Sequence, residues 1–227
     1  MKDNSVLRLG GAMAILLGIA KVLSSVGYLL LPAAQRQTAK GPVFLPSYAQ
    51  SSGLLNAIFW SEALVGIFGL AVVPALASLV HSRSEGWTRW ASTLALAGFV
   101  VTSVGYMASI ARVPGIAAAF VAGDASTKAA LAVVWRSSPD LLGFWGYGAI
   151  GIWVLVVSIL ALRGKDLSTI LNIIGILLAL LYILVPISVM QKSATLQLGI
   201  AGLGALLAPI WYIWVGLALW RPRAEAA

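Results

Sequence analysis

Residues 52–80 read SGLLNAIFWSEALVGIFGLAVVPALASLV, an apolar run of membrane-spanning length that contains one charge, Glu62. A helix needs about 20 consecutive apolar residues to cross a bilayer, so this stretch predicts a transmembrane helix. Membrane barrels are built instead from segments of about ten residues with alternating polarity. The stretch therefore indicates an all-α membrane protein.

Similar apolar runs recur along the 227 residues of the chain. Hydrophobic residues make up 60% of the sequence, charged residues only 10%, and the mean hydropathy is +0.96. These values lie far outside the range of soluble domains. We predict one integral membrane domain, residues 1–227, that forms a polytopic bundle of six transmembrane helices. The predicted spans cover about residues 5–31, 52–80, 91–112, 139–162, 168–190 and 197–220.

The net charge of +8 comes from Lys and Arg residues scattered at the ends of the apolar runs. They form no basic stripe for a phosphate backbone, so we expect membrane lipids and not nucleic acid as partners of this charge. With the N-terminus inside, eight Lys and Arg residues would face the cytoplasm and six the outside. Because basic loops tend to stay in the cytoplasm, both termini are predicted to be cytoplasmic.

Several kinds of chemistry are excluded by composition. The chain has no cysteine and one histidine, His81, which removes disulfides, thiolate metal sites and paired histidine ligands. No catalytic motif such as a nucleophile elbow, a zinc-binding helix or a phosphate-binding loop is present. We therefore expect a protein that is not an enzyme, with no catalytic residue, no metal site and no cofactor.

Two long connections are predicted at the end of the bundle away from the termini. Residues 32–51 contain glycine and prolines and are expected to form an extended, ordered or semi-ordered loop over the bundle mouth. Residues 113–138 are expected to contain an interfacial helix that starts near Asp124 or Ser126 and ends near Trp135. That helix is either a lid or a static surface helix.

The two charges inside the first two spans lie at nearly the same depth. Lys21 precedes Pro32 by eleven residues and Glu62 follows Ser51 by eleven, so both are roughly 16 Å from their shared loop at about 1.5 Å per residue. A charge in the bilayer core costs on the order of 3 kcal/mol unless it is paired or hydrated. We predict that Lys21 and Glu62 meet in the middle or outer half of the bundle.

Polar neighbours at helical spacing extend this candidate site. The residues assigned to an ion pair or a ligand-binding site are Lys21, Glu62, Tyr28, Ser25, Asn56 and Tyr106. The pair either orients the first two helices or takes part in proton exchange or ligand binding, and Lys21 alone can also snorkel towards water. Gly10, Ala14 and Gly18 recur every four residues, which predicts close packing against an internal helix or another protein.

Three motifs in the second half carry a family resemblance: residues 139–143 (PDLLG), 167–175 (LSTILNIIG) and 208–216 (APIWYIWVG). With these motifs the chain resembles the bacterial six-helix membrane proteins known as domain of unknown function 4386. The resemblance implies a multi-pass protein of the bacterial inner membrane and assigns no ligand residues. We expect a binding or permeation subunit for a small ligand or ion; the alternative is an accessory or structural subunit that binds other membrane subunits.

Overall fold

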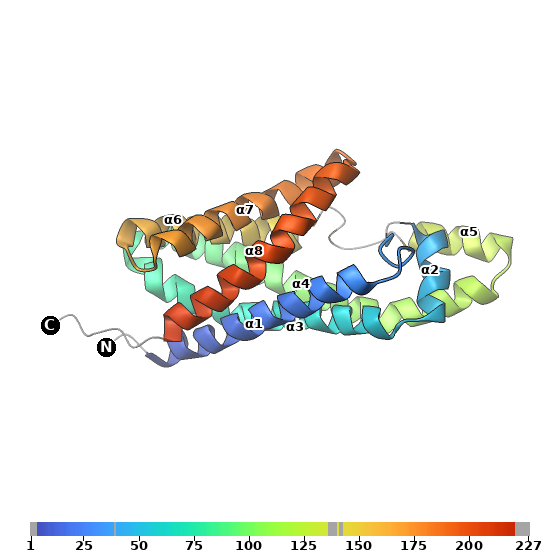
Figure 1. Cartoon of the computed structure of the whole chain (residues 1–227), viewed down its shortest axis with the longest axis horizontal. Helices are drawn as coiled ribbons and strands as arrows, with labels where there is room; N and C mark the ends of the chain where they lie inside the picture. The colour runs from blue at the N-terminus through green and yellow to red at the C-terminus, as the bar shows by residue number, and fades with distance from the viewer. Residues whose placement is uncertain (1–3, 39, 136–139, 141–142, 221–227) are drawn as a thin grey trace.

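A computed structural model of the chain describes residues 4–38, 40–135, 140 and 143–220. The described residues form helices and no strands (Figure 1). Six of the helices are long and apolar enough to cross a membrane, which confirms the predicted all-α architecture with six spans. Figure 1 places the start of the first helix and the end of the last one at the same end of the bundle, here called the terminal end.

The six long helices are α1 (Asn4–Leu30), α3 (Gly53–Val80), α4 (Glu85–Ala122), α6 (Ile150–Gly164), α7 (Thr169–Met190) and α8 (Ala194–Trp220). A π-helical segment, η2 (Phe144–Ala149), leads directly into α6, and a short 3-10 helix, η1 (His81–Arg83), separates α3 from α4. Two shorter helices, α2 (Gly41–Gln50) and α5 (Ala125–Val134), lie at the opposite end, here called the α2–α5 end (Figure 1).

Small residues let the helices of the bundle approach closely. Gly10 of α1 lies against Ala75 of α3, and Gly18 lies against the backbone of α8 at Pro209. Ala14, between them, is fully buried. Close backbone approach through small residues is a common way for transmembrane helices to associate. The predicted small-residue face of α1 therefore packs inside the bundle, between α3 and α8.

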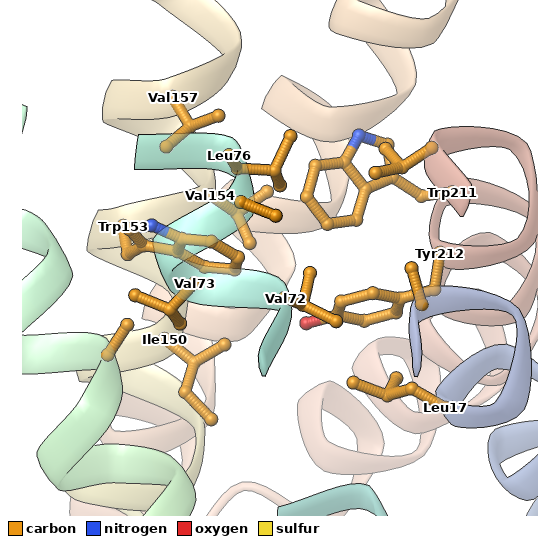
Figure 2. Packing of buried hydrophobic residues seen from close by; sticks show 14 of the residues in the cluster. Leu17, Val72, Val73, Leu76, Ile150, Trp153, Val154, Val157, Trp211 and Tyr212 are labelled. Carbon is orange, nitrogen blue, oxygen red and sulfur yellow. The ribbon is translucent and has the colours of Figure 1, made fainter. Parts of the chain in front are cut away.

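The core is rich in large aromatic and branched side chains. Trp153 of α6 packs edge-on against Trp211 of α8, with ring centroids 6.3 Å apart, and Trp211 packs against its neighbour Tyr212. Figure 2 shows these rings meeting Leu17 and Leu76 in the interior. Because lipid is as apolar as these side chains, such contacts stabilise the bundle mainly through tight packing.

Two predictions about the ends of the spans and their connections are wrong. Residues 32–51 are not an extended loop, because α2 forms within them and has a proline in its first turn, where a missing N–H costs nothing. The third span does not end at residue 112 but continues to Ala122, because Ala117 and Phe120 are buried against the short helices. The predicted start of the fourth span, at residue 139, lies outside the described residues, and the described helix begins at Phe144.

The α2–α5 end is a folded cap on the bundle. Trp135 stacks on Phe44 at 4.8 Å and donates a hydrogen bond from Nε1 to the carbonyl of Thr38 at 2.7 Å. Gln35 is buried and its amide donates to the carbonyls of Ser47 and Ser51. These contacts join α2 to the end of α5 and to residues 31–38, the segment that follows α1.

The interfacial helix predicted near Asp124 is α5, and Asp124 is its N-cap. The carboxylate accepts a hydrogen bond from the amide of Thr127 at 2.8 Å and another from the hydroxyl of Ser126 at 2.9 Å. The backbone hydrogen bond from Thr127, together with the nearby hydroxyl groups, lowers the pKa of Asp124 to about 2. The cap is thus fully charged near neutral pH, where it stabilises the start of α5.

Candidate functional site

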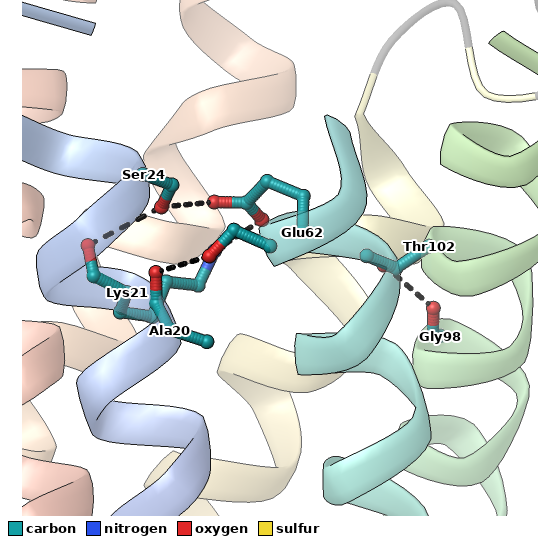
Figure 3. A network of polar contacts seen from close by, with 7 residues as sticks. Ala20, Lys21, Ser24, Glu62, Gly98 and Thr102 are labelled. Carbon is teal, nitrogen blue, oxygen red and sulfur yellow. Dashed lines mark hydrogen bonds and ion pairs between the residues drawn. The ribbon is translucent and has the colours of Figure 1, made fainter. Parts of the chain in front are cut away.

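Lys21 of α1 and Glu62 of α3 form an ion pair inside the spanning part of the bundle. Lys21 Nζ lies 2.7 Å from Glu62 Oε2, and the hydroxyl of Ser24 donates to Glu62 Oε1 at 2.7 Å (Figure 3). Each carboxylate oxygen therefore has a partner. The two charges that the sequence places at one depth do meet, and the structure adds a hydroxyl to them.

A second polar contact joins α1 and α3 one residue away from the pair. The hydroxyl of Ser61 donates to the carbonyl of Ala20 at 2.7 Å. Ser61 and Glu62, adjacent residues of α3, thus bind Ala20 and Lys21, adjacent residues of α1. Because both links are short, this stretch of the α1–α3 interface holds the two charged side chains in fixed positions.

The pair is largely but not fully enclosed. The exposed fraction of the side chain is 13% for Lys21 and 10% for Glu62. In a low-dielectric interior the attraction between two charges is strong, but removing both from water offsets much of the gain. Each side chain therefore keeps a small part of its surface outside the protein interior.

Three tyrosines from three other elements surround the pair. The ring centroid of Tyr147, on η2, lies 6.0 Å from Lys21 Nζ, within the range of a cation–π interaction. Tyr147 packs edge-on against Tyr182 of α7 at 5.4 Å, and its side chain makes a polar contact with Tyr106 of α4. The site is thus built where α1, α3, α4, η2 and α7 meet.

The predicted site residues separate into two groups. Tyr106 joins the pair, because it contacts Tyr147 and packs against Phe59 at 6.0 Å. Tyr28 is 43% exposed and its hydroxyl donates to the carbonyl of Arg36. Asn56 accepts a hydrogen bond from Tyr48 of the cap at 2.7 Å. Tyr28 and Asn56 therefore belong to the α2–α5 end, one or more turns away from the charges.

Ser25 is replaced in the site by its neighbour Ser24. Ser24 follows Lys21 by three residues and is buried against α3, whereas Ser25 is only half-buried. Both spacings, three and four, lie on the same side of a helix as Lys21, so spacing alone does not choose between them. Which serine faces Glu62 depends on how α1 is rotated about its axis against α3. The packing of Gly10 and Gly27 against α3 sets this rotation.

Tyr147 and Tyr182 are the functional-site residues that sequence reasoning missed. Tyr147 is brought to Lys21 by the π-helical turn of η2, and π-helical turns occur often at functional sites. The turn begins after Gly143, which has a positive φ of 69°, and Asp140 accepts hydrogen bonds from the amides of Trp145 and Gly146. The only sequence signal for this turn is its density of glycine around aromatic residues.

The site has the groups needed to exchange protons or to bind a small charged solute. Within the described ranges, no cluster of three His, Asp or Glu side chains is placed to hold a metal ion. The carboxylate, the ammonium group and four hydroxyl groups provide both donors and acceptors. The fold and this site define a multi-pass helical membrane protein with an ion pair inside its spanning region.

The family assignment agrees with the motifs in the second half of the chain. The family described as "Domain of unknown function (DUF4386)" matches residues 6–220, and the chain belongs to this family. No curated protein and no solved structure matches the chain.

Proposed function

We propose that the protein is a non-enzymatic binding or permeation subunit for a small ligand or ion, and that the Lys21–Glu62 pair is its binding site. The observation that carries this proposal is a charged pair, inside the spanning region, whose two side chains keep 13% and 10% of their surface exposed. Ionisable residues within transmembrane segments commonly mark solute or proton pathways. The tyrosines around the pair supply the walls of such a site.

A solute binds here by taking the place of one member of the pair. An anion competes with Glu62 for the ammonium group of Lys21, and a cation or a proton competes with Lys21 for the carboxylate. Ser24 hydrogen-bonds the carboxylate in the paired state, and the carbonyl of Lys21, 3.2 Å from the Ser24 hydroxyl, is an alternative acceptor. The serine can therefore change partner without losing its hydrogen bond, which lowers the cost of opening the pair.

A purely structural role explains the pair less well. Replacing a buried ion pair by apolar residues is often neutral or stabilising, so a pair of this kind adds little to stability. The α1–α3 interface already has the Ser61–Ala20 hydrogen bond and the close contact of Gly10 with Ala75. We infer that the two charges serve a function beyond holding α1 against α3.

The proposed setting is the bacterial inner membrane, with both termini in the cytoplasm. The α2–α5 end then faces outwards and covers the outer ends of α1 and α3, the two helices that carry the pair. The cap of α2 and α5 either moves as a lid or stays in place as a surface layer, and both arrangements are compatible with binding at the pair.

Native mass spectrometry of the protein released from mild detergent tests this proposal. We compare the wild type with the double variant Lys21→Met/Glu62→Leu, and use Glu85→Gln as a control because Glu85 pairs with Arg89 at an exposed position. The proposal predicts a bound small solute in the wild type and the control that is lost from the double variant. Identical spectra for all three folded proteins would reject it.

The alternative function, an accessory subunit of a larger complex, has support on α8. A Cβ atom added at Gly199, Gly202 or Gly204 meets no other atom within 4 Å, and Leu198 nearby is 72% exposed. Small residues that face open space on a transmembrane helix are suited to a neighbouring helix. A second protein retained in the same native spectra supports this alternative, whereas a lone chain counts against it.

A further inference from the structure

A second set of buried polar groups lies between α6, α7 and α8. Each of its members has a buried side-chain nitrogen or oxygen without a hydrogen-bond partner in the described part of the protein. The members are Trp153, Ser158, Asn172, Trp211 and Tyr212, and all are at most 1% exposed. We call them the α6–α8 polar cluster. Trp153, Trp211 and Tyr212 are labelled in Figure 2.

Gly175 of α7 is the point on which two of these groups converge. A Cβ atom at Gly175 would collide with the hydroxyl of Ser158 and would lie 2.5 Å from the indole nitrogen of Trp211. Ser158 comes from α6 and Trp211 from α8, so three helices bring a hydroxyl and an indole N–H to the same bare stretch of backbone. Yet the hydroxyl and the indole N–H do not bond to each other or to any other described residue.

The cluster continues along one face of α7 towards the ion pair. Asn172, Gly175, Ala179 and Tyr182 follow one another at intervals of three or four residues, which places them on one side of the helix. From Asn172 to Tyr182 this face covers about 15 Å at 1.5 Å per residue. Tyr182 packs edge-on against Tyr147 at 5.4 Å, and the ring centroid of Tyr147 lies 6.0 Å from Lys21 Nζ of the pair.

The chemistry of the unpartnered groups identifies their ligand class. The indole N–H groups are donors only, the free oxygen of Asn172 is an acceptor, and the hydroxyls of Ser158 and Tyr212 do both. Leaving a buried polar group unpaired costs about 1–3 kcal/mol, so five such groups in one core need partners. A small molecule that both donates and accepts within a tightly packed space is water, which commonly fills this role in protein interiors.

We propose that α6, α7 and α8 bind a line of water molecules, anchored between Ser158 and Trp211, that connects the terminal end of α7 with the Lys21–Glu62 pair. If the proposed function is correct, this water connects the pair with the terminal side, and the proton is then the ion that the pair exchanges. The binding of water at Ser158 and Trp211 does not depend on that function and is tested separately.

The test uses the indole N–H groups themselves as reporters of water. We label the full chain with ¹⁵N-tryptophan, place it in lipid nanodiscs and assign the indole signals of Trp153 and Trp211 with Trp→Phe variants. Magnetisation transfer from water to the Trp211 indole proton is expected in the wild type. Absence of any transfer to Trp211, in a sample where the exposed Trp87 and Trp90 show it, would overturn the proposal.

Two variants locate the water. Gly175→Ala places a methyl group against the hydroxyl of Ser158 and 2.5 Å from the indole nitrogen of Trp211, so it pushes these two groups out of their positions and is expected to abolish the transfer to Trp211. The control Gly202→Ala, whose methyl group meets no atom within 4 Å, is expected to leave the transfer unchanged. An unchanged signal in folded Gly175→Ala would place the water elsewhere and reject the site. Neither result depends on what the ion pair binds, so failure of the water site and failure of the proposed function are distinguishable.

Ser158→Ala provides a second reading if Gly175→Ala does not fold. In a hydrated site the variant loses a water ligand, so the transfer to Trp211 weakens and the thermal midpoint falls. In a dry site the variant removes an unpaired buried hydroxyl, so the midpoint rises. A raised midpoint with no water signal at Trp211 would therefore contradict the proposal.

Discussion

Breaking the Lys21–Glu62 pair from one side should destabilise the protein far more than removing both charges. The Lys21 side chain is only 13% exposed, and its ammonium nitrogen lies 2.7 Å from a carboxylate oxygen of Glu62. In the Glu62→Leu variant this ammonium group loses its partner. Lys21→Met leaves the carboxylate in the same position. Removing one member of a buried pair typically costs about 3–5 kcal/mol, because the other charge remains buried without a partner.

The double variant Lys21→Met/Glu62→Leu should recover most of this loss. Apolar replacement of both charges is often neutral or stabilising by about 1–4 kcal/mol. Ser24 loses its carboxylate acceptor, but the carbonyl of Lys21 lies 3.2 Å from its hydroxyl and can take over. We therefore expect the double variant to be within about 1 kcal/mol of the wild type and the coupling energy to be about 3 kcal/mol or more.

The assay is unfolding of all four proteins in mixed micelles of rising SDS content, followed by circular dichroism. The matched control is the cycle of Glu85 and Arg89, an exposed pair at 3.2 Å, which should show a coupling of about 0.5 kcal/mol or less. Additive single effects of less than about 1 kcal/mol each would refute the reasoning, because they would show that both charges are solvated and independent in the membrane.

Three further predictions concern packing and the cap. Gly66→Ala places a Cβ atom 2.6 Å from the carbonyl of Phe99, so the same unfolding assay should show a loss of about 1–3 kcal/mol, and an unchanged curve would contradict the close α3–α4 contact. Gln35→Leu removes the two hydrogen bonds that hold α2, so hydrogen exchange in α2 should accelerate at a local cost of about 1–3 kcal/mol, while exchange in α6 stays the same. Asp124 has a pKa lowered to about 2, so its stabilisation of α5 is present above the ordinary pKa of 3.8 and is lost as the pH falls towards 2. The protection of α5 amides from hydrogen exchange should therefore fall in that pH interval. The Asp124→Ala variant is the control and should show no such change.

The sequence predicts the spanning helices and the central contact well, because both depend on local signals. Apolar length identifies the six helices, and the depth of Lys21 and Glu62 follows from counting along two helices that share a loop. Neither signal requires knowledge of how the helices rotate against each other. The sequence alone therefore predicts that Lys21 and Glu62 meet, as they do in the structure at 2.7 Å.

The parts that sequence reasoning misses depend on tertiary packing. The choice of Ser24 over Ser25 is made by the rotation of α1, and Tyr147 reaches Lys21 through a π-helical turn that hydrophobic periodicity does not mark. The extension of α4 to Ala122 is stabilised by burial of Phe120 against the cap, and the sequence does not predict the α2 helix of that cap. Each of these features arises from contacts between elements distant in the sequence.

Single-cysteine labelling tests directly whether a solute can reach the Lys21–Glu62 pair. The chain has no cysteine, so Ser24→Cys puts the only thiol beside Glu62 without further changes. Ser51→Cys, at an exposed position, is the positive control, and Ala63→Cys, at a fully buried position on α3, is the negative control. We predict that a small charged methanethiosulfonate added to the protein in liposomes modifies the Ser24→Cys and Ser51→Cys variants but not the Ala63→Cys variant. Modification of the Ser51→Cys variant alone would show that the pair is closed to solutes and would contradict a binding site at Lys21 and Glu62.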